Sequence, residues 1–478
     1  MAFYKLGLKN RALAQCFGVF LTLAFVGCSE NTALNVTNDN YSASGLNTKN
    51  IRYAPAAPKY TVNANYNEIN HSINGNLTVS FTNNLGKPMH QVRFNVWANS
   101  PILGSSTTIK NVRLNGKPAK ASLQNTVLTI HDTAVNDGET ATVNFTFNIN
   151  IPKQKDRFGW DARQASLGNW LPILAVYDNH GWNTPPYFAL GESFYSVTGD
   201  FDVTITAPAD LEVLATGQQI SKSKLENRQT IHFLAPNVRD FFMILNTPFK
   251  KMTAKIGDMT VTVAYRKGEE DAAAKMLTTA KQVLPKFEAW FGDYPWQTLT
   301  IASADYSSNF DGGMEYPTLV TINTPELPDD EELSVTVAHE IAHQWFYSLV
   351  GSNAYREPWL DEALTTFASY AAVYDTTDFD WIESSKTGIS ITSSAADFSN
   401  HKDDYGQVIY DDGAKMLSQL HDHVGDKIFW QALRRYTDEN RFGIATTADF
   451  IRIFQEESKQ NLKPFFERQG VILDETRE

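Results

Sequence analysis

Cysteine is the scarcest residue of this 478-residue chain, which contains only Cys16 and Cys28. The chain therefore cannot build a disulfide framework or a zinc–thiolate site. Beyond the N-terminal segment, no stretch approaches the roughly 18 apolar residues of a membrane-spanning helix. Basic residues are in the minority, with 41 Lys and Arg against 54 Asp and Glu and a net charge of −13. Such an acidic chain is a poor binder of nucleic acid, so we expect no nucleic-acid partner.

The N-terminal segment has the features of a targeting signal. Lys5, Lys9 and Arg11 precede an apolar run over 13–26, and Cys28 follows it directly after a glycine. This pattern resembles a bacterial lipoprotein signal, in which Cys28 becomes the lipidated N-terminus; ordinary secretion with cleavage nearby is the alternative. We therefore expect a signal peptide over 1–27 and a protein of the bacterial cell envelope that is extracytoplasmic and held at the membrane by lipidated Cys28.

Residues 28–50 are rich in Asn, Ser and Thr and lack hydrophobic periodicity, which predicts a flexible tether. Ser29, next to the cysteine, is compatible with sorting to the outer membrane if the host is Gram-negative.

Hydrophobic patterning divides the rest of the chain into two domains. Hydrophobic residues make up 42% and charged residues 20%, a composition that excludes a mainly disordered chain. From 51 to 250 the period is two, and Asn115-Gly116 and Asp137-Gly138 are hairpin-type turns, so this part is predicted to be an antiparallel β domain. From 251 to 478, strands come first and helices after, which predicts an α+β domain. Its predicted elements are strands over 261–265, 299–302 and 318–322, a helix over 269–291 with a kink or break at Pro285, and further helices beyond Glu332.

The most informative stretch is His339-Glu340-Ile341-Ala342-His343. On a helix, residues four apart share a face, so His339 and His343 can bind one metal ion. Glu340 is turned by about 100° and can reach a metal-bound water instead. A helix with polar residues on one face remains the alternative for the bare pattern.

Glu362 supplies a candidate third ligand. Eighteen residues separate it from His343, and Pro358 can begin a second helix that returns antiparallel to the first. Two His and one Glu leave the fourth position of zinc open, as a hydrolytic site requires. Upstream, Gly312 and Gly313 precede Met314 and Glu315, and their glycines allow an extended substrate to approach the backbone closely.

Together these motifs resemble the aminopeptidase N family of gluzincin zinc metallopeptidases. The resemblance implies a thermolysin-like catalytic domain in which His339, His343 and Glu362 bind one zinc ion per chain and Glu340 is the general base. It also implies that Gly312, Gly313, Met314 and Glu315 lie along the substrate, that Glu315 binds its N-terminal amine, and that Tyr410 hydrogen-bonds the oxyanion. Tyr316 stands where the family has Asn, and Asp411 and Asp412 depart from the family pattern after Tyr410.

The expected activity is therefore zinc-dependent hydrolysis of N-terminal residues from extracytoplasmic peptides by a Glu340-activated, zinc-bound water. A zinc endopeptidase and a non-catalytic surface-binding lipoprotein are the alternatives. The large C-terminal helical domain of the family has no counterpart in the sequence, so an open cleft is expected.

Several further residues have two interpretations. His421-Asp422-His423 is a second metal site or a surface pair of histidines, and Asn169-Trp170-Leu171-Pro172 is a substrate contact or core. Asp361 either orients a zinc histidine or lies in a solvated helix start. Gln164 and Glu192 are guesses for a second amine-binding residue from the β domain.

Overall fold

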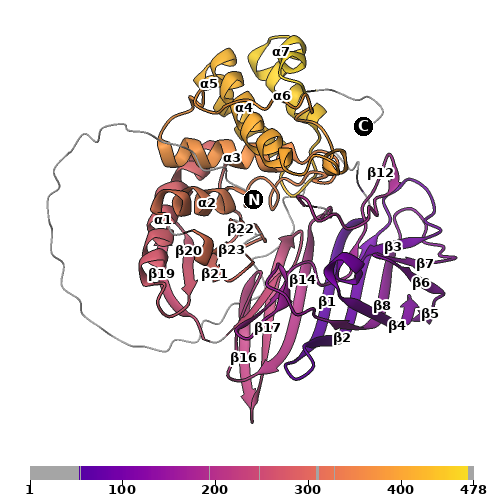
Figure 1. The fold of residues 1–478 in the computed structure, drawn as a ribbon. Coiled ribbons are helices and arrows are strands. Elements are labelled where there is room, and N and C mark those ends of the chain that lie inside the picture. The colour runs from indigo at the N-terminus through magenta and orange to yellow at the C-terminus, as the bar shows by residue number, and fades with distance from the viewer. Residues whose placement is uncertain are drawn as a thin grey trace. The chain divides into compact units, whose positions relative to one another are not determined.

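A computed structural model of the chain describes residues 53, 55–192, 194–246, 248–307, 312–327 and 329–471 (Figure 1). The predicted signal peptide, the tether and Cys28 lie outside the described residues. Among the helices in the described part, none has the length and apolarity needed to cross a membrane.

The first half is built on an eight-stranded sheet. In spatial order its strands are β16 (Gln218–Leu225), β17 (Arg228–Val238), β14 (Gly199–Pro208), β1 (Ala56–Asn67), β2 (Ser72–Thr82), β8 (Thr140–Asn150), β4 (Ser106–Leu114) and β5 (Lys117–Pro118). Alternate side chains such as Leu77, Val79 and Phe81 are buried, as a period of two requires. The turn predicted at Asn115-Gly116 joins β4 to β5, with positive φ at both residues.

One pairing in this sheet departs from the antiparallel prediction. β1 and β14 run parallel, with Lys59 opposite Asp200 and Asn65 opposite Thr206. More than a hundred residues separate the two strands, so no hairpin fixes their relative direction. An alternating pattern reports which face is buried and carries no information about the direction of the neighbouring strand.

Smaller sheets complete the β half and enclose its core. One contains β15 (Glu212–Ala215), β18 (Met243–Asn246), β10 (Gln164–Leu167) and β9 (Phe158–Trp160); another contains β11 (Ile173–Leu174), β3 (Val92–Asn95), β7 (Val127–Ile130) and β6 (Ala121–Gln124). A two-stranded hairpin pairs β12 (Tyr177–Asp178) with β13 (Gly181–Trp182). Their apolar side chains and those of the eight-stranded sheet form one buried cluster.

The second half begins with a five-stranded sheet. Its order is β19 (Lys250–Ile256), β20 (Met259–Tyr265), β21 (Thr298–Ala304), β23 (Leu319–Asn323) and β22 (Gly313–Met314). Each of the three predicted strands is present, with ends that differ from the prediction by at most two residues. β22, the short strand that carries two of the predicted substrate-binding residues, lies at the edge of the sheet.

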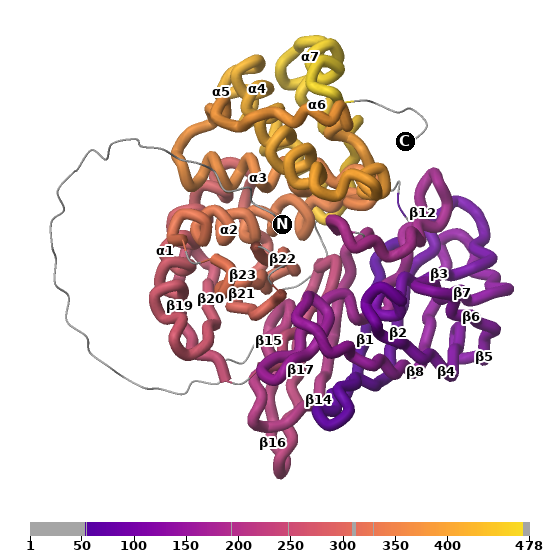
Figure 2. The backbone as a smooth tube through the Cα atoms, in the orientation of Figure 1, coloured from indigo at the N-terminus to yellow at the C-terminus, as the bar shows by residue number. Residues whose placement is uncertain are grey.

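Helices cover this sheet and make up the remainder of the second half. They are α1 (Glu270–Phe291), α2 (Asp330–Ala342), α3 (Trp359–Tyr374), the π-helical turn η7 (Gly406–Asp412), α4 (Gly413–Val424), α5 (Asp426–Glu439), α6 (Thr447–Ser458) and α7 (Lys463–Arg468). α1 packs on β20, and α2 lies between α1 and α3 and contacts β22 and β23 (Figures 1 and 2). Short 3₁₀ turns occur at Trp97–Asn99, Pro101–Leu103, Thr324–Glu326 and Ala395–Phe398.

Pro285 does not divide α1, so the break considered for this position is absent. Buried apolar side chains continue across the proline, from Met276 and Val283 before it to Phe287 and Phe291 after it. An interior proline costs about 3 kcal/mol in an isolated helix, and burial of a continuous apolar face offsets that cost here.

Candidate active site

Two neighbouring helices bring the predicted metal ligands together. Asp329 caps the start of α2, because its side chain accepts hydrogen bonds from the backbone N–H groups of Glu331 and Glu332. His339 lies in the last turn of this helix, and His343 is its C-cap residue. α3 packs against α2 and supplies Glu362 from its first turn.

The ligand atoms of this group fit a zinc ion. His339 Nε2 and His343 Nε2 are 3.0 Å apart, and Glu362 Oε2 lies 3.3 Å from the first and 3.4 Å from the second. Tetrahedral zinc with bonds of about 2.0–2.1 Å places neighbouring ligand atoms about 3.3–3.4 Å apart. All three side chains are buried. The residues present are therefore suited to hold zinc and leave a position open for another ligand.

Asp361 fixes the orientation of one histidine. Its Oδ1 lies 2.8 Å from His343 Nδ1, and the Phe346 carbonyl lies 3.0 Å from the same nitrogen. Nδ1 therefore carries the proton and donates it, which leaves the Nε2 lone pair free for a metal. Asp361 is buried, so the first of its two interpretations is the one that the structure favours.

Glu340 points its carboxylate into the same buried space. Its Oε2 has no hydrogen-bond partner among the described residues. Burial, together with the charge of Glu362, raises the pKa of Glu340 to about 8 against the opposing effect of His343. A Cβ at Gly313 would lie 2.7 Å from Glu340 Cγ, so only glycine lets β22 approach so closely.

Glu315 lies directly after the edge strand and faces the helix. One oxygen each from Glu315 and Glu340 and a nitrogen of His343 all lie within 4.8 Å of one another. Glu315 is 6% exposed, and its pKa is raised well above the usual range by burial and then by the charge of Glu192. A cation is the natural partner for such a carboxylate.

Gln344 is a site residue that the sequence reading missed. Its side-chain NH₂ lies 3.3 Å from the carbonyl oxygens of both Glu315 and Tyr316, and its Oε1 accepts a hydrogen bond from Thr318 N at 2.8 Å. The residue after His343 therefore ties the segment from Glu315 to Thr318 to the end of α2. No spacing rule predicts a role for Gln344, although its position directly after His343 could have indicated one.

Tyr316 turns away from the site into the β half. Its ring stacks on Phe242 with centroids 4.1 Å apart and planes 4° apart. A Cβ at Gly168 would lie 2.0 Å from its hydroxyl oxygen, so that position requires glycine. The tyrosine found where the family has Asn thus anchors the loop that carries Glu315.

Tyr410 lies on the π-helical turn that leads into α4. Its ring is 5.8 Å from the His339 ring, at an angle of 18°. Burial, followed by the charge of Glu362, raises its pKa well above the usual range, so the hydroxyl keeps its proton. π-Helical turns are frequent at functional sites, and here the turn places a hydroxyl beside the metal ligands.

Of the two guesses from the β half, only Glu192 acts on the site electrostatically. Its charge raises the pKa of Glu315 and of Glu340, and Arg157 Nη1 holds it at 2.5–2.6 Å. The Gln164 side chain is instead bonded to the backbone N–H and carbonyl of Asp305. The role of Glu192 toward a substrate amine stays a prediction.

For the two remaining candidate segments, 169–172 and 421–423, the structure favours a packing role over a functional one. Trp170 is fully buried and donates from Nε1 to the Phe241 carbonyl at 3.0 Å, so its segment belongs to the core. His421 is buried, not part of a surface pair; it packs against the Phe429 ring and lies 3.1 Å from an Asp426 oxygen, while His423 stacks on Phe465.

Tyr405 is another residue that the sequence did not indicate. It is buried, its hydroxyl has no partner among the described residues, and it lies close to Gly191, the neighbour of Glu192.

Comparison with known proteins points to one family. Residues 275–469 match the peptidase family M1 domain. Aminopeptidase M1-A of Oryza sativa subsp. japonica is 25% identical over 311 residues, which cover 59% of this chain and 34% of the rice protein. Aminopeptidase B of Rattus norvegicus is 26% identical over 254 residues, covering 46% of this chain and 38% of the rat protein. The chain thus spans about a third of the length of these curated relatives.

Solved structures show the same fold over nearly the whole chain. The M1 zinc metallopeptidase from Deinococcus radiodurans superposes with a TM-score of 0.64 at 17% identity, over 90% of this chain and 97% of that one. A β-rich first half followed by an α+β second half is therefore confirmed as the fold class. The domain boundary at residues 250 and 251 stays a prediction.

Proposed function

We propose that the chain is a zinc-dependent aminopeptidase of the aminopeptidase N-like gluzincins and that it acts on peptides. One observation carries the proposal: a three-residue metal group, a buried glutamate and a second buried carboxylate next to an edge strand all converge within a few ångströms. The metal group and the base suit hydrolysis, and the second carboxylate suits selection of a free amine.

His339, His343 and Glu362 would hold the zinc ion, with Asp361 fixing the His343 ring. When bound, zinc supplies a Lewis acid that polarises the scissile carbonyl and lowers the pKa of water. Glu340 accepts the proton of the attacking water and passes it to the leaving amine. Tyr410, which keeps its proton, donates a hydrogen bond to the oxyanion.

Glu315 would set the position of the cut. An extended peptide can pair with the free edge of β22, whose other edge is bonded to β23. Its N-terminal ammonium then meets the buried Glu315 carboxylate, with the negative charge of Glu192 nearby. A solved structure of the Deinococcus radiodurans relative contains a Tyr-Ser-Ala substrate, which supports peptides as the substrate class.

We also propose that the protein is extracytoplasmic and carries a lipid on Cys28. The proposal is based on the positively charged segment and the apolar run that precede Cys28. The test is membrane fractionation of cells that express wild type or Cys28→Ser. The variant should leave the membrane fraction; if it stays there as fully as wild type, lipidation of Cys28 is not the anchor.

The activity is tested by hydrolysis of aminoacyl reporter substrates. The purified chain is assayed after chelation and again after zinc is restored. We expect activity to disappear and return with zinc. A zinc-loaded chain that cleaves no reporter and no free peptide would favour the non-catalytic alternative, and cleavage of internal bonds would favour the endopeptidase.

A further inference from the structure

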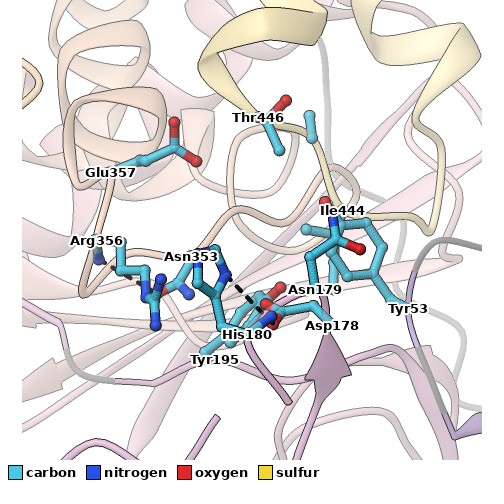
Figure 3. A pocket seen from close by; sticks show the side chains of 11 residues that line it. Tyr53, Asp178, Asn179, His180, Tyr195, Asn353, Arg356, Glu357, Ile444 and Thr446 are labelled. Atoms are coloured by element: carbon cyan, nitrogen blue, oxygen red, sulfur yellow. Dashed lines mark hydrogen bonds and ion pairs between the residues drawn. The ribbon is translucent and has the colours of Figure 1, made fainter. Parts of the chain in front are cut away.

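A cavity of about 390 Å³ lies outside the zinc site. Its walls come from the β12–β13 hairpin, the loop that precedes α3 and the segment that precedes α6, together with Tyr53 and Tyr195 (Figure 3). None of the proposed catalytic, metal-binding or substrate-binding residues lines it. Its volume falls within the range of about 300–1,000 Å³ typical of small-molecule sites.

Arg356 contributes an uncommitted positive charge to this cavity. Its side chain is half-buried and makes no hydrogen bond or ion pair with any residue that the structure describes. Only its backbone N–H is used locally, in a bond to Asn353 Oδ1 at 3.2 Å. A guanidinium presents five N–H donors in a planar fork that matches a carboxylate.

Tyr195 lines the same cavity and is 2% exposed. Its ring packs with Val176 and Ile444, while its hydroxyl has no hydrogen-bond partner among the described residues. Burial and the charges of its surroundings raise its pKa well above the usual range, so the hydroxyl is a proton donor. The hydroxyl is therefore available to donate a hydrogen bond to a ligand in the cavity.

Asp178 supplies the opposite charge. Its side chain is 12% exposed. Oδ1 accepts a hydrogen bond from His180 N at 2.9 Å and lies 3.6 Å from His180 Nδ1, while Oδ2 has no partner in the described part of the chain. Asp178 and Arg356 line one cavity yet form no ion pair with each other there. The other acid in the wall, Glu357, accepts a hydrogen bond from Thr447 N at the start of α6, where the helix dipole offsets its charge.

We propose that this cavity binds a small zwitterion of the α-amino-acid class. The ligand carboxylate bonds to the Arg356 guanidinium and the Tyr195 hydroxyl, and the ligand ammonium bonds to Asp178. Separated opposite charges favour a ligand that carries both signs over a simple anion or cation. This goes beyond the proposed peptidase activity, because binding at the cavity requires no turnover.

Isothermal titration calorimetry on the zinc-loaded full-length chain tests the proposal. The probes are L-alanine, N-acetyl-L-alanine, which lacks the ammonium, and L-alaninol, which lacks the carboxylate and has no amide bond to be hydrolysed. Because the proposed catalytic site also binds free amines, the titrations are repeated in a Glu315→Ala background. We expect L-alanine binding to persist there and both single-charge analogues to bind at least about tenfold more weakly.

Arg356→Gln should weaken L-alanine binding at least about tenfold, and Tyr195→Phe, which keeps the ring, about 2- to 10-fold. Arg468→Gln is the matched control, because Arg468 is exposed on α7 outside the cavity, and it should bind like wild type. The proposal is overturned if L-alanine fails to bind, if binding is lost in Glu315→Ala, or if Arg356→Gln binds normally. If N-acetyl-L-alanine binds as tightly as L-alanine, the cavity does not require a zwitterion and the proposal is wrong. Hydrolysis of the reporter is measured in parallel. If the chain does not hydrolyse the reporter but binds L-alanine through Arg356, only the proposed peptidase activity is contradicted.

Discussion

Glu315→Ala should remove most of the preference for substrates with a free N-terminus. The Glu315 carboxylate is 6% exposed, lies within 4.8 Å of the Glu340 and His343 ligand atoms, and faces the negative charge of Glu192. A substrate ammonium that enters this space makes a charge-assisted hydrogen bond worth roughly 1.5–3 kcal/mol. Since about 1.4 kcal/mol is a factor of ten, its loss should lower kcat/KM for a free peptide about 10–150-fold.

The assay compares one peptide in its free and N-acetylated forms, with wild type and variant. Wild type should strongly prefer the free form, and the variant should lose that preference through poorer use of the free peptide. Glu315→Gln keeps a hydrogen-bond acceptor but loses the negative charge, so its preference for the free peptide should lie between those of wild type and Glu315→Ala. Glu326→Ala, a half-exposed acid in the turn after β23, is the matched control and should behave like wild type. Equal cleavage of both forms by wild type, or an unchanged preference in Glu315→Ala, would refute this reasoning.

Three further predictions concern the metal site and the β half. Glu362→Ala should lower zinc content per chain, because only two protein ligands remain; full stoichiometry by elemental analysis would contradict the ligand set. Asp361→Ala should weaken zinc binding about 10–100-fold in chelator competition, because His343 Nδ1 loses its carboxylate acceptor and keeps the weaker Phe346 carbonyl; unchanged affinity would reject that role. Burial raises the pKa of Asp240 from 3.8 to about 7, so the folded state binds the extra proton and stability falls as pH rises from about 4 to about 7. In thermal unfolding, Asp240→Asn should lose less stability than wild type between about pH 4 and about pH 7. Identical dependence of stability on pH in the two proteins would contradict the role of Asp240.

The local sequence was enough to predict the metal group. His339, Glu340 and His343 are linked by helical geometry, and Glu362 needed only a second helix packed on the first. The alternating pattern likewise predicted a β domain, because burial of one face of a sheet imposes a period of two. Each of these features depends on contacts between residues that are close in the sequence or on the nearest packed element.

Features that depend on distant contacts were not predictable in the same way. The turn of Tyr316 into the β half depends on Gly168 and Phe242, which come much earlier in the chain. The parallel pairing of β1 with β14 depends on the assembled fold in the same way, and so does the burial of the Tyr405 hydroxyl without a partner among the described residues. Residue spacing holds no record of such contacts, because they arise only once segments far apart in the sequence have packed together.

The most direct test of the account is the turnover of zinc-loaded Glu340→Gln. Glutamine keeps the size of the side chain but cannot accept a proton from water. General base catalysis is typically worth about 10²–10⁴-fold, so kcat on an aminoacyl reporter should fall by that factor while zinc content stays near one per chain. A zinc-loaded Glu340→Gln variant that turns over at the wild-type rate would contradict Glu340 as the base and the mechanism built on it.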